Sequence, residues 1–163
     1  MASPRTPFLP PRLFVRAAWI VHRRLHAMTR GRRGLWPPTA DRWGTMKLRT
    51  VGRQTGKPRI AILGYFEDGP NLVTMAMNGW ADPEPKWWLN LQARPEATVD
   101  LGDGPIEVIA HAATGDERTR LWARWAHYDK ELEGYAARRS RPTQVVVLEP
   151  RDAGVRGSGT RAT

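Results

Sequence analysis

A chain of 163 residues is long enough for one domain with a real core, and its lack of cysteine excludes disulfides, thiolate metal sites and cysteine nucleophiles. The four histidines form neither an HExxH motif nor a close pair with a carboxylate, so we expect no metal site. The formal net charge of +10 is uneven, because residues 1–50 hold eleven cations and one acid, which leaves fifteen of each for residues 51–163. A nucleic-acid or membrane function would therefore rest on the N-terminal part.

Residues 1–35 are predicted to form a basic arm. Four prolines before residue 12 indicate an extended start, and a helix is expected over about residues 12–29. At about 100° per residue most of its arginines gather on one side and most of its apolar residues on the other, although Arg24 breaks the apolar face and Trp19 lies among the arginines. Such an amphipathic helix either lies on an anionic bilayer or covers one end of the folded domain, and both alternatives stay open.

The apolar runs are all shorter than the roughly 18 residues that a membrane span needs. We expect neither a span nor a signal peptide. The expected location is the cytoplasm, with peripheral attachment to the inner face of the cell membrane left open.

Strand patterns begin after a linker at residues 31–44. Alternating apolar runs predict strands over residues 46–51, 58–66 and 71–77, with a turn at residues 67–70. A loop rich in glycine and proline follows at residues 78–85, and then a short helix over residues 86–93.

The second half of the chain continues the antiparallel pattern. Two strands, residues 97–101 and 106–112, flank a Gly-Asp-Gly turn. Helices are expected over residues 116–125, with Thr114 as N-cap, and over about residues 130–139. The apolar run 145–148 predicts a buried strand, and residues 151–163 a disordered tail.

These elements amount to about six antiparallel strands with three or four peripheral helices. Strands and helices do not alternate, which argues against a doubly wound sheet. The predicted class is mainly β, a small closed or half-closed β-barrel over residues 36–150, because closure removes exposed edges.

The turn between the first two strands concentrates positive charge. Arg53, Lys57 and Arg59 surround a glycine-containing hairpin turn. A rigid cationic tip with free backbone N–H groups can hold an anion. The alternative is a solvated turn with ordinary surface charges.

Reactive side chains are not obvious in this sequence. Asp82 and Glu84 lie in the proline-rich loop, and Asp116 and Glu117 suit the start of a helix. There is no GxGxxG, Walker lysine or GxSxG motif. A cationic turn together with an aromatic-rich helix therefore points to a bound cofactor that supplies the reactivity.

Three motifs occur in order: Gly52-Arg53-x-Thr55-Gly56-x-Pro58-Arg59, then Pro85-x-Trp87-x-x-Asn90-Leu91, then Val-Val-Val-Leu-Glu-Pro at residues 145–150. Together they resemble the deazaflavin-dependent nitroreductase family, whose best-known members are quinone reductases that use reduced coenzyme F420. The likeness covers about residues 43–150. It implies a split β-barrel of the FMN-binding type, and F420, an 8-hydroxy-5-deazaflavin with a phosphate and an oligoglutamate tail, as cofactor.

The resemblance also implies a set of cofactor-binding residues. In it, arginines and a threonine of the tip bind phosphate or carboxylate oxygens, and the run from 75 to 77 borders the ring edge. One of the two tryptophans of the short helix would face the cofactor and the other the core, and Asn90 would donate hydrogen bonds or cap the helix end. The implied residues are Arg53, Gln54, Thr55, Lys57, Arg59, Ile60, Ala61, Met75, Ala76, Met77, Asn78, Lys86, Trp87 and Asn90.

On the acceptor side the sequence departs from the family. Met77-Asn78 stands where the known nitroreductase has a Ser-Lys pair, and of three tyrosines near the substrate only Tyr135 stays in register. Tyr135 is the catalytic candidate, and Trp19 or Trp43 could supply the missing aromatic wall. The expected reaction is hydride transfer to a quinone or a nitroaromatic compound, with the physiological acceptor left open.

Two other functions remain compatible with the sequence. One is a split-barrel reductase that uses FMN. The other is a non-catalytic module whose basic arm binds anionic lipid or nucleic acid, although nucleic acid is not expected because residues 51–163 are balanced in charge. The oligomeric state is left open.

Overall fold

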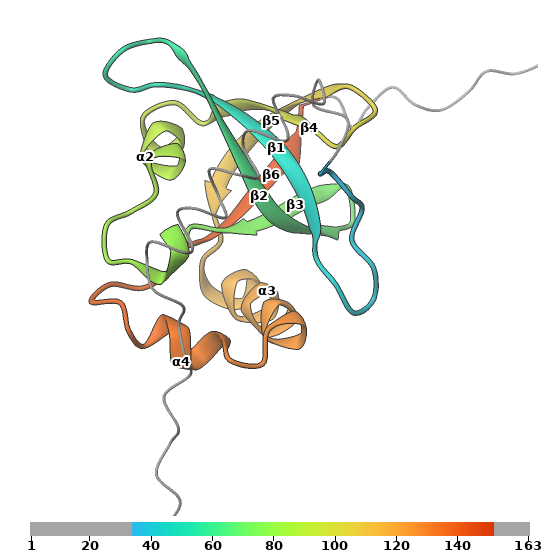
Figure 1. Ribbon diagram of the computed structural model, residues 1–163, viewed down its shortest axis with the longest axis vertical. Helices are drawn as coiled ribbons and strands as arrows, with labels where there is room; N and C mark the ends of the chain where they lie inside the picture. Colours follow the sequence, from blue (N-terminus) through green and yellow to red (C-terminus); the bar gives the residue numbers. More distant parts are fainter. Residues whose placement is uncertain (1–33, 152–163) are drawn as a thin grey trace, which may run out of the picture.

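The computed structural model describes residues 34–151, and its centre is a closed barrel of six antiparallel strands in the order β1-β2-β3-β6-β5-β4 (Figure 1). The strands are β1 (Gly44–Val51), β2 (Pro58–Asp68), β3 (Asn71–Met75), β4 (Glu96–Asp100), β5 (Pro105–Ala112) and β6 (Val145–Pro150). The predicted N-terminal helix, Trp19 and the predicted tail beyond residue 151 lie outside the described residues. The expected barrel of six antiparallel strands is confirmed.

Three helices and one short turn complete the described part. They are α2 (Lys86–Ala93), α3 (Gly115–Tyr128), α4 (Leu132–Ala136) and the 3-10 turn η1 (Asn78–Trp80). Within residues 34–151, no helix combines the length and apolar character that crossing a membrane requires.

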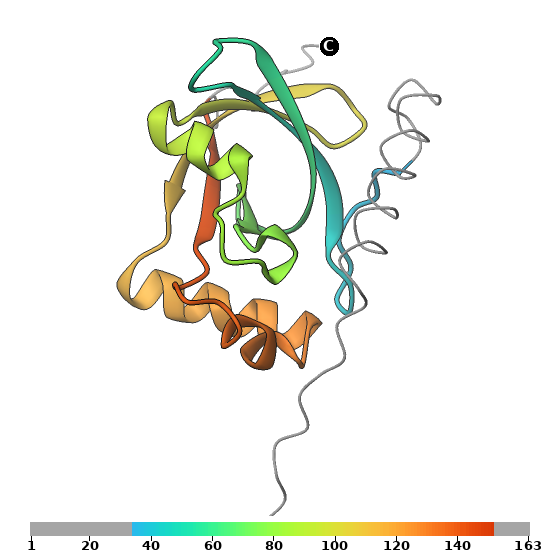
Figure 2. The same ribbon diagram turned by 60° about the vertical axis from the view of Figure 1, so that its left-hand side comes forward.

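Alternation along the strands divides the apolar residues into two layers. One set fills the barrel and the end covered by α2, and includes Met46, Leu48, Tyr65, Trp88 and Leu91. The other set lies outside the barrel wall, where α3 covers β3 and β6, and includes Phe66, Val73, Leu121, Trp125 and Val147. Figure 2 shows α2 across one end of the barrel, with α3 and α4 below it.

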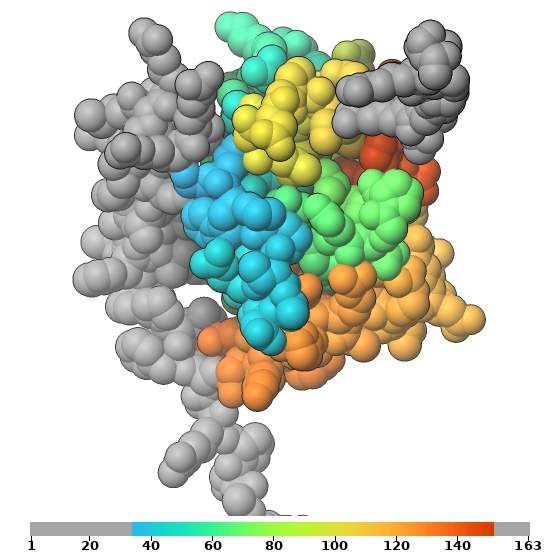
Figure 3. Space-filling view, turned by 90° about the vertical axis from the view of Figure 1, so that its right-hand side faces the viewer, coloured from blue at the N-terminus to red at the C-terminus, as the bar shows by residue number. Residues whose placement is uncertain are grey.

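Ion pairs and aromatic contacts attach α3 to the end of β2. Asp68 accepts two hydrogen bonds from Arg120, at 2.7 and 2.9 Å, and one from Arg124 at 3.2 Å. The guanidinium of Arg124 also lies 4.3 Å from the centroid of the Phe66 ring. On the face seen in Figure 3, residues 34–43 lie against the barrel between the β4–β5 turn and the helices.

Several predicted boundaries were wrong. The helix expected over residues 116–125 runs to Tyr128, and β2 continues to Asp68, into the predicted turn. β3 ends at Met75 instead of continuing to Met77, because Met77 already has αR dihedrals and leads into η1, although Ala76 N–H still bonds to Gln144 O. The helix expected over residues 130–139 is shorter, Leu132–Ala136. Beyond Ala136 the N–H groups of Arg138 and Arg139 bond only three residues back, to Tyr135 O and Ala136 O, so the α-helix tightens and ends there.

Candidate functional site

The hairpin between β1 and β2 holds a compact tip at residues 52–57. β1 and β2 stay paired up to Val51 and Pro58, so the tip is anchored at its base. Within the tip, Gly52 N–H donates to Lys57 O at 2.9 Å, and Gly56 N–H donates to Gly52 O at 2.7 Å. The predicted rigid turn is therefore present.

Thr55 organises the polar groups of this tip. Its Oγ1 accepts from Lys57 N at 3.4 Å and from Arg59 Nη2 at 3.3 Å. With both lone pairs used, the hydroxyl hydrogen is left to donate outward. The side chains of Arg53, Lys57 and Arg59 are exposed around it. Three cations and an outward O–H suit a phosphate or carboxylate ligand.

Asn90 joins this tip to α2. Its Oδ1 accepts from the backbone N–H of Arg53 at 3.1 Å, and its Nδ2 donates to Thr50 Oγ1 at 3.1 Å. Asn90 is buried, so its bond to Thr50 is shielded from water, and its bond from Arg53 is partly shielded. The Asn90 side chain therefore does not cap its own helix. The predicted hydrogen bond to a cofactor stays a prediction, and the second hydrogen of Nδ2 is available for it.

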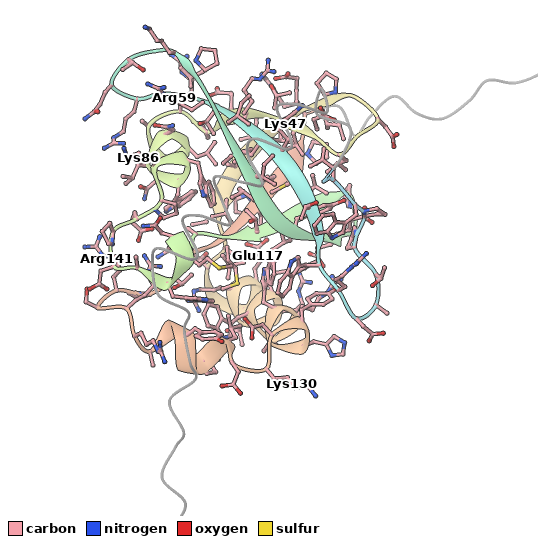
Figure 4. All side chains as sticks on the ribbon, in the orientation of Figure 1. Lys47, Arg59, Lys86, Glu117, Lys130 and Arg141 are labelled. Atoms are coloured by element: carbon pink, nitrogen blue, oxygen red, sulfur yellow. The ribbon has the colours of Figure 1, made fainter. Side chains whose placement is uncertain are left out.

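The α2 helix places a cation and an aromatic ring beside the tip. Lys86 is exposed in its first turn, and Trp87 is half-buried. Trp88 is buried in the barrel core, with its ring 6.3 Å from that of Trp87. Figure 4 places Arg59, Lys86 and Arg141 along the same side of the molecule. The division between one tryptophan in the core and one nearer the surface agrees with the expectation from sequence.

The two predicted residues of β2 face opposite sides of the sheet. Arg49 pairs with Ile60, and Leu48 pairs with Ala61. Leu48 points into the barrel, and Ala61 therefore does so too, while Ile60 lies on the outer face with 49% of its surface exposed. Their side chains therefore face different spaces, Ala61 the barrel interior and Ile60 the outer surface.

The predicted residues 75–78, at and after the end of β3, divide into a buried pair and a pair that reaches the surface. Met75 and Ala76 are 2% and 0% exposed, and both are packed in the core. Met77 is half-buried and Asn78 exposed, so these two reach the surface. Asn78 Nδ2 donates to Pro83 O at 2.7 Å, which closes the loop between β3 and α2.

Tyr135, the catalytic candidate, lies on α4 beside this loop. Its ring stacks on Trp80 with centroids 5.7 Å apart and planes 22° from parallel. Trp43, one of the two residues expected to supply an aromatic wall, instead packs on Trp125 at 5.9 Å and over Gly64. The aromatic neighbour of Tyr135 among the described residues is therefore Trp80, which sequence reasoning missed.

Arg139 was also missed, although it holds the loop between β3 and α2. Its side chain is 0% exposed and forms an ion pair with Glu84 at 3.6 Å. The nearby carboxylate of Asp82 accepts from Ser140 N–H at 2.6 Å, and this hydrogen bond lowers the pKa of Asp82. A single tryptophan in an otherwise polar loop could have marked Trp80 as a candidate site residue. The burial of Arg139 could not be predicted, because no local sequence pattern indicates a buried arginine.

A shallow pocket of about 250 Å³ lies elsewhere, in the seam between β1 and β4. These strands pair only from Lys47↔Asp100 to Arg49↔Thr98, and beyond that point they diverge. Arg49 and Arg94 line the pocket together with Glu96 and Glu107, so its charges balance. None of the predicted cofactor residues line this pocket. Because its charges balance, it attracts an anion less strongly than the cationic tip does.

A family model and the sequences of known relatives point to the same family. A family model described as F420H(2)-dependent quinone reductase matches residues 21–150. The F420H(2)-dependent quinone reductase Rv1261c of Mycobacterium tuberculosis is 31% identical over 134 residues, which are 80% of this chain and 89% of that protein. Another protein of the same organism, Rv3178, is 30% identical over 107 residues, 66% of this chain and 90% of its own length.

Solved structures support the same fold. An F420-H2 dependent reductase, FDR-A, superposes with a TM-score of 0.58 at 24% identity, covering 64% of this chain and 93% of its own. A protein described as a domain-swapped dimer gives a TM-score of 0.62 at 22% identity, covering 82% and 99%. At these identities the likeness establishes the split-barrel fold.

Proposed function

Because this chain belongs to the family of F420H(2)-dependent quinone reductases, we propose that it binds reduced coenzyme F420 and reduces a quinone. When bound, the reduced deazaflavin supplies the hydride. The quinone gains this hydride and a proton and leaves as a quinol. The task of the polypeptide is to bind, orient and stabilise charge.

The observation that carries this proposal is the preorganised cationic tip. Arg53 and Arg59 would hold the phosphate oxygens with fork geometry, and the Thr55 hydroxyl would add a hydrogen bond. Lys57 would meet the carboxylates of the oligoglutamate tail. These side chains are exposed before the ligand binds. An anionic ligand can therefore form charge-assisted hydrogen bonds with them without breaking buried hydrogen bonds of the protein.

The ring would lie between α2 and the loop after β3. Trp87 offers an aromatic face, Lys86 a charge, and Met77 and Asn78 the surface of the loop. In this arrangement Met75 and Ala76 support the site from within the core. Tyr135, on the far side of the loop, would donate the proton that the reduced quinone oxygen needs.

Quinones are the proposed acceptor class, and reduction of nitroaromatic compounds would be incidental. A planar, electron-poor ring stacks well on aromatic side chains, which this side of the molecule supplies. The Met77-Asn78 pair provides no hydroxyl or ammonium for a nitro group at that position.

A titration distinguishes the cofactors. Purified full-length protein is titrated against F420 and against FMN, following ligand fluorescence, and then assayed with F420H2 and menadione. We expect micromolar or tighter binding of F420, weaker binding of FMN, and menadione-dependent oxidation of F420H2. Tight binding of FMN with no response to F420 would replace this proposal by an FMN-dependent reductase.

We further propose that residues 1–35 bring the enzyme to an anionic membrane surface, where lipid-soluble quinones reside. Composition supports this, since residues 1–35 hold eight of the 26 cations and no acid. Sedimentation with phosphatidylglycerol vesicles tests it: a variant that starts at Trp36 should lose vesicle binding and keep F420 binding. Equal sedimentation of both proteins would refute the membrane role and leave the reductase activity untouched.

A further inference from the structure

The loop between β3 and α2 is wrapped around a single buried guanidinium. Arg139 Nε donates to Ala81 O at 3.0 Å, and Nη1 donates to Ala76 O at 3.0 Å and to Thr143 Oγ1 at 2.9 Å. Nη2 donates to Asp82 O at 3.4 Å and pairs with Glu84 Oε1 at 3.6 Å. All three guanidinium nitrogens of Arg139 thus bind groups of residues 76–84 or the hydroxyl of Thr143.

That loop adopts a conformation that side-chain-bearing residues seldom take. Asn78 and Trp80 have φ of 46° and 62°, and Gly79 between them has φ of 61°. Positive φ is unfavourable for a residue with a Cβ and persists where surrounding contacts determine it. The bonds of Arg139 to carbonyls 76, 81 and 82 bracket these three residues and provide such contacts.

This backbone conformation orients the Trp80 side chain toward Tyr135. The indole is half-buried and lies almost parallel to the Tyr135 ring, 5.7 Å away and tilted by 22°. The guanidinium of Arg138 lies 5.9 Å from the centroid of the same tyrosine ring. A partly exposed pair of near-parallel rings beside a cation suits a flat acceptor that becomes more negative as it is reduced.

We propose that Trp80 is an acceptor-contact residue, forming with Tyr135 the aromatic wall on which the quinone stacks, and that Arg139 is the positioning residue that holds Trp80 there. The proposal rests on the proposed function, since it names the acceptor side of the same site. It also explains how this chain can lack two of the three tyrosines of the known nitroreductase and still present an aromatic surface.

The competing explanation is that Trp80 and Tyr135 only pack α4 against the loop. Acceptor kinetics separate the two, because a packing role changes stability and a contact role changes the KM for the acceptor. The full-length protein is compared with Trp80→Ala, Trp80→Phe and Arg139→Lys. Trp36→Ala is the control, since Trp36 is another half-buried tryptophan, held by hydrogen bonds to residues 43 and 45.

Three quantities are measured for each protein: F420 affinity by fluorescence, the melting temperature, and steady-state kinetics with F420H2 and menadione. Trp80→Ala should raise the KM for menadione at least fivefold while F420 affinity stays within twofold, and Trp80→Phe should restore most of the loss. Arg139→Lys, which keeps the charge and loses the fork, should raise the same KM. Trp36→Ala should leave it unchanged.

The failures are distinguishable. If wild-type protein does not bind F420, the proposed function falls and this inference with it. If F420 binds normally and Trp80→Ala keeps the wild-type KM, the inference alone is wrong. If Arg139→Lys does not fold, Thr143→Val takes its place, because it removes one hydrogen-bond partner of Arg139. The proposal is overturned if the KM for menadione is unchanged in both Thr143→Val and Trp80→Ala.

Discussion

The side chain of Asn90 accepts a hydrogen bond from the backbone N–H of Arg53, 37 residues earlier in the chain, at 3.1 Å. The same amide donates to Thr50 Oγ1, so a residue of α2 holds both the tip and the end of β1. The cationic tip is therefore fixed relative to the helix that carries Lys86 and Trp87. A ligand that touches both elements meets a site whose parts are already in place.

Removal of the Asn90 amide should loosen the tip. We expect Asn90→Ala to lower the free energy of unfolding by about 2 kcal/mol, because one buried and one partly buried hydrogen bond are lost. F420 affinity should fall roughly tenfold, or about 1.4 kcal/mol, as Arg53 loses its fixed position. Urea unfolding and F420 titration measure the two effects.

Thr50→Val is the matched control for Asn90→Ala. It removes the acceptor of the Asn90 Nδ2 and keeps the bond to Arg53. Its cost in stability should be about 1 kcal/mol, with F420 affinity within twofold of wild type. An equal loss of affinity in both variants would contradict the role given to the Arg53 contact.

Loss of the tip arginines should greatly weaken cofactor binding without unfolding the protein. Each charge-assisted contact is worth roughly 1.5–3 kcal/mol, so the double substitution of Arg53 and Arg59 by alanine should weaken F420 binding by two orders of magnitude or more. Both side chains are exposed, and the melting temperature should therefore change little. Arg94→Ala, an exposed arginine that lines the seam pocket, should bind F420 normally. Normal binding by the double variant would place the anionic end of the cofactor elsewhere.

The barrel and the tip were predictable because both depend on local patterns. Alternation set the strands, and a glycine turn between two of them fixed the positions of Thr55 and Arg59. The end of β3 was placed two residues too late because Met77 continues an apolar pattern, while its backbone is already turning toward η1.

The acceptor side could not be predicted in the same way. The contacts of Arg139 with Ala76 and Ala81 span 63 and 58 residues of sequence and leave no periodicity in either segment. Burial of an arginine and the positive φ of Trp80 are consequences of that tertiary arrangement. The aromatic wall was therefore expected at Trp19, which lies outside the described residues, or at Trp43, which covers Gly64.

Asp68 should make stability depend on pH in the acidic range. Hydrogen bonds and charge from Arg120, and further attraction from Arg124, lower the pKa of this carboxyl below its ordinary value of 3.8. A lowered folded-state pKa contributes stability above the unfolded-state pKa and loses it as pH falls through the folded-state value. The cost of Asp68→Asn should thus be present at pH 7 and shrink below about pH 4, with a magnitude of roughly 0.5–1 kcal/mol.

Urea midpoints of wild type and Asp68→Asn between pH 7 and pH 3 measure this dependence. Asp103→Asn, in the exposed β4–β5 turn, is the control and should match wild type at pH 7. A cost for Asp68→Asn that stayed constant down to pH 3 would show that the ion pairs with α3 are not its cause.

The hydroxyl of Tyr135 can be tested apart from its ring. Tyr135→Phe keeps the stack on Trp80 and removes the proposed proton donor. We expect kcat with menadione to fall about tenfold and KM to stay unchanged. This is less than the roughly 10²–10⁴-fold effect typical of general acid catalysis, because water can replace the tyrosine hydroxyl as proton donor. Tyr128→Phe, whose ring packs on Phe66 and Trp125, should behave as wild type. An unaltered kcat in Tyr135→Phe would assign the proton to water.

Two glycines of the tip should respond differently to the same added methyl group. A Cβ at Gly52 would lie 2.9 Å from Thr55 Oγ1 and 3.2 Å from Lys57 O, so Gly52→Ala must displace the hydroxyl that accepts from Arg59. F420 affinity should fall roughly tenfold, as expected for one lost hydrogen bond of about 1–1.5 kcal/mol. Gly56 has φ of 65° and nothing near its Cβ position, so Gly56→Ala should instead cost about 1 kcal/mol of stability and spare the affinity. Titration with F420 and urea unfolding of both variants check this, and the reverse pattern would mean that Thr55 does not contact the anion.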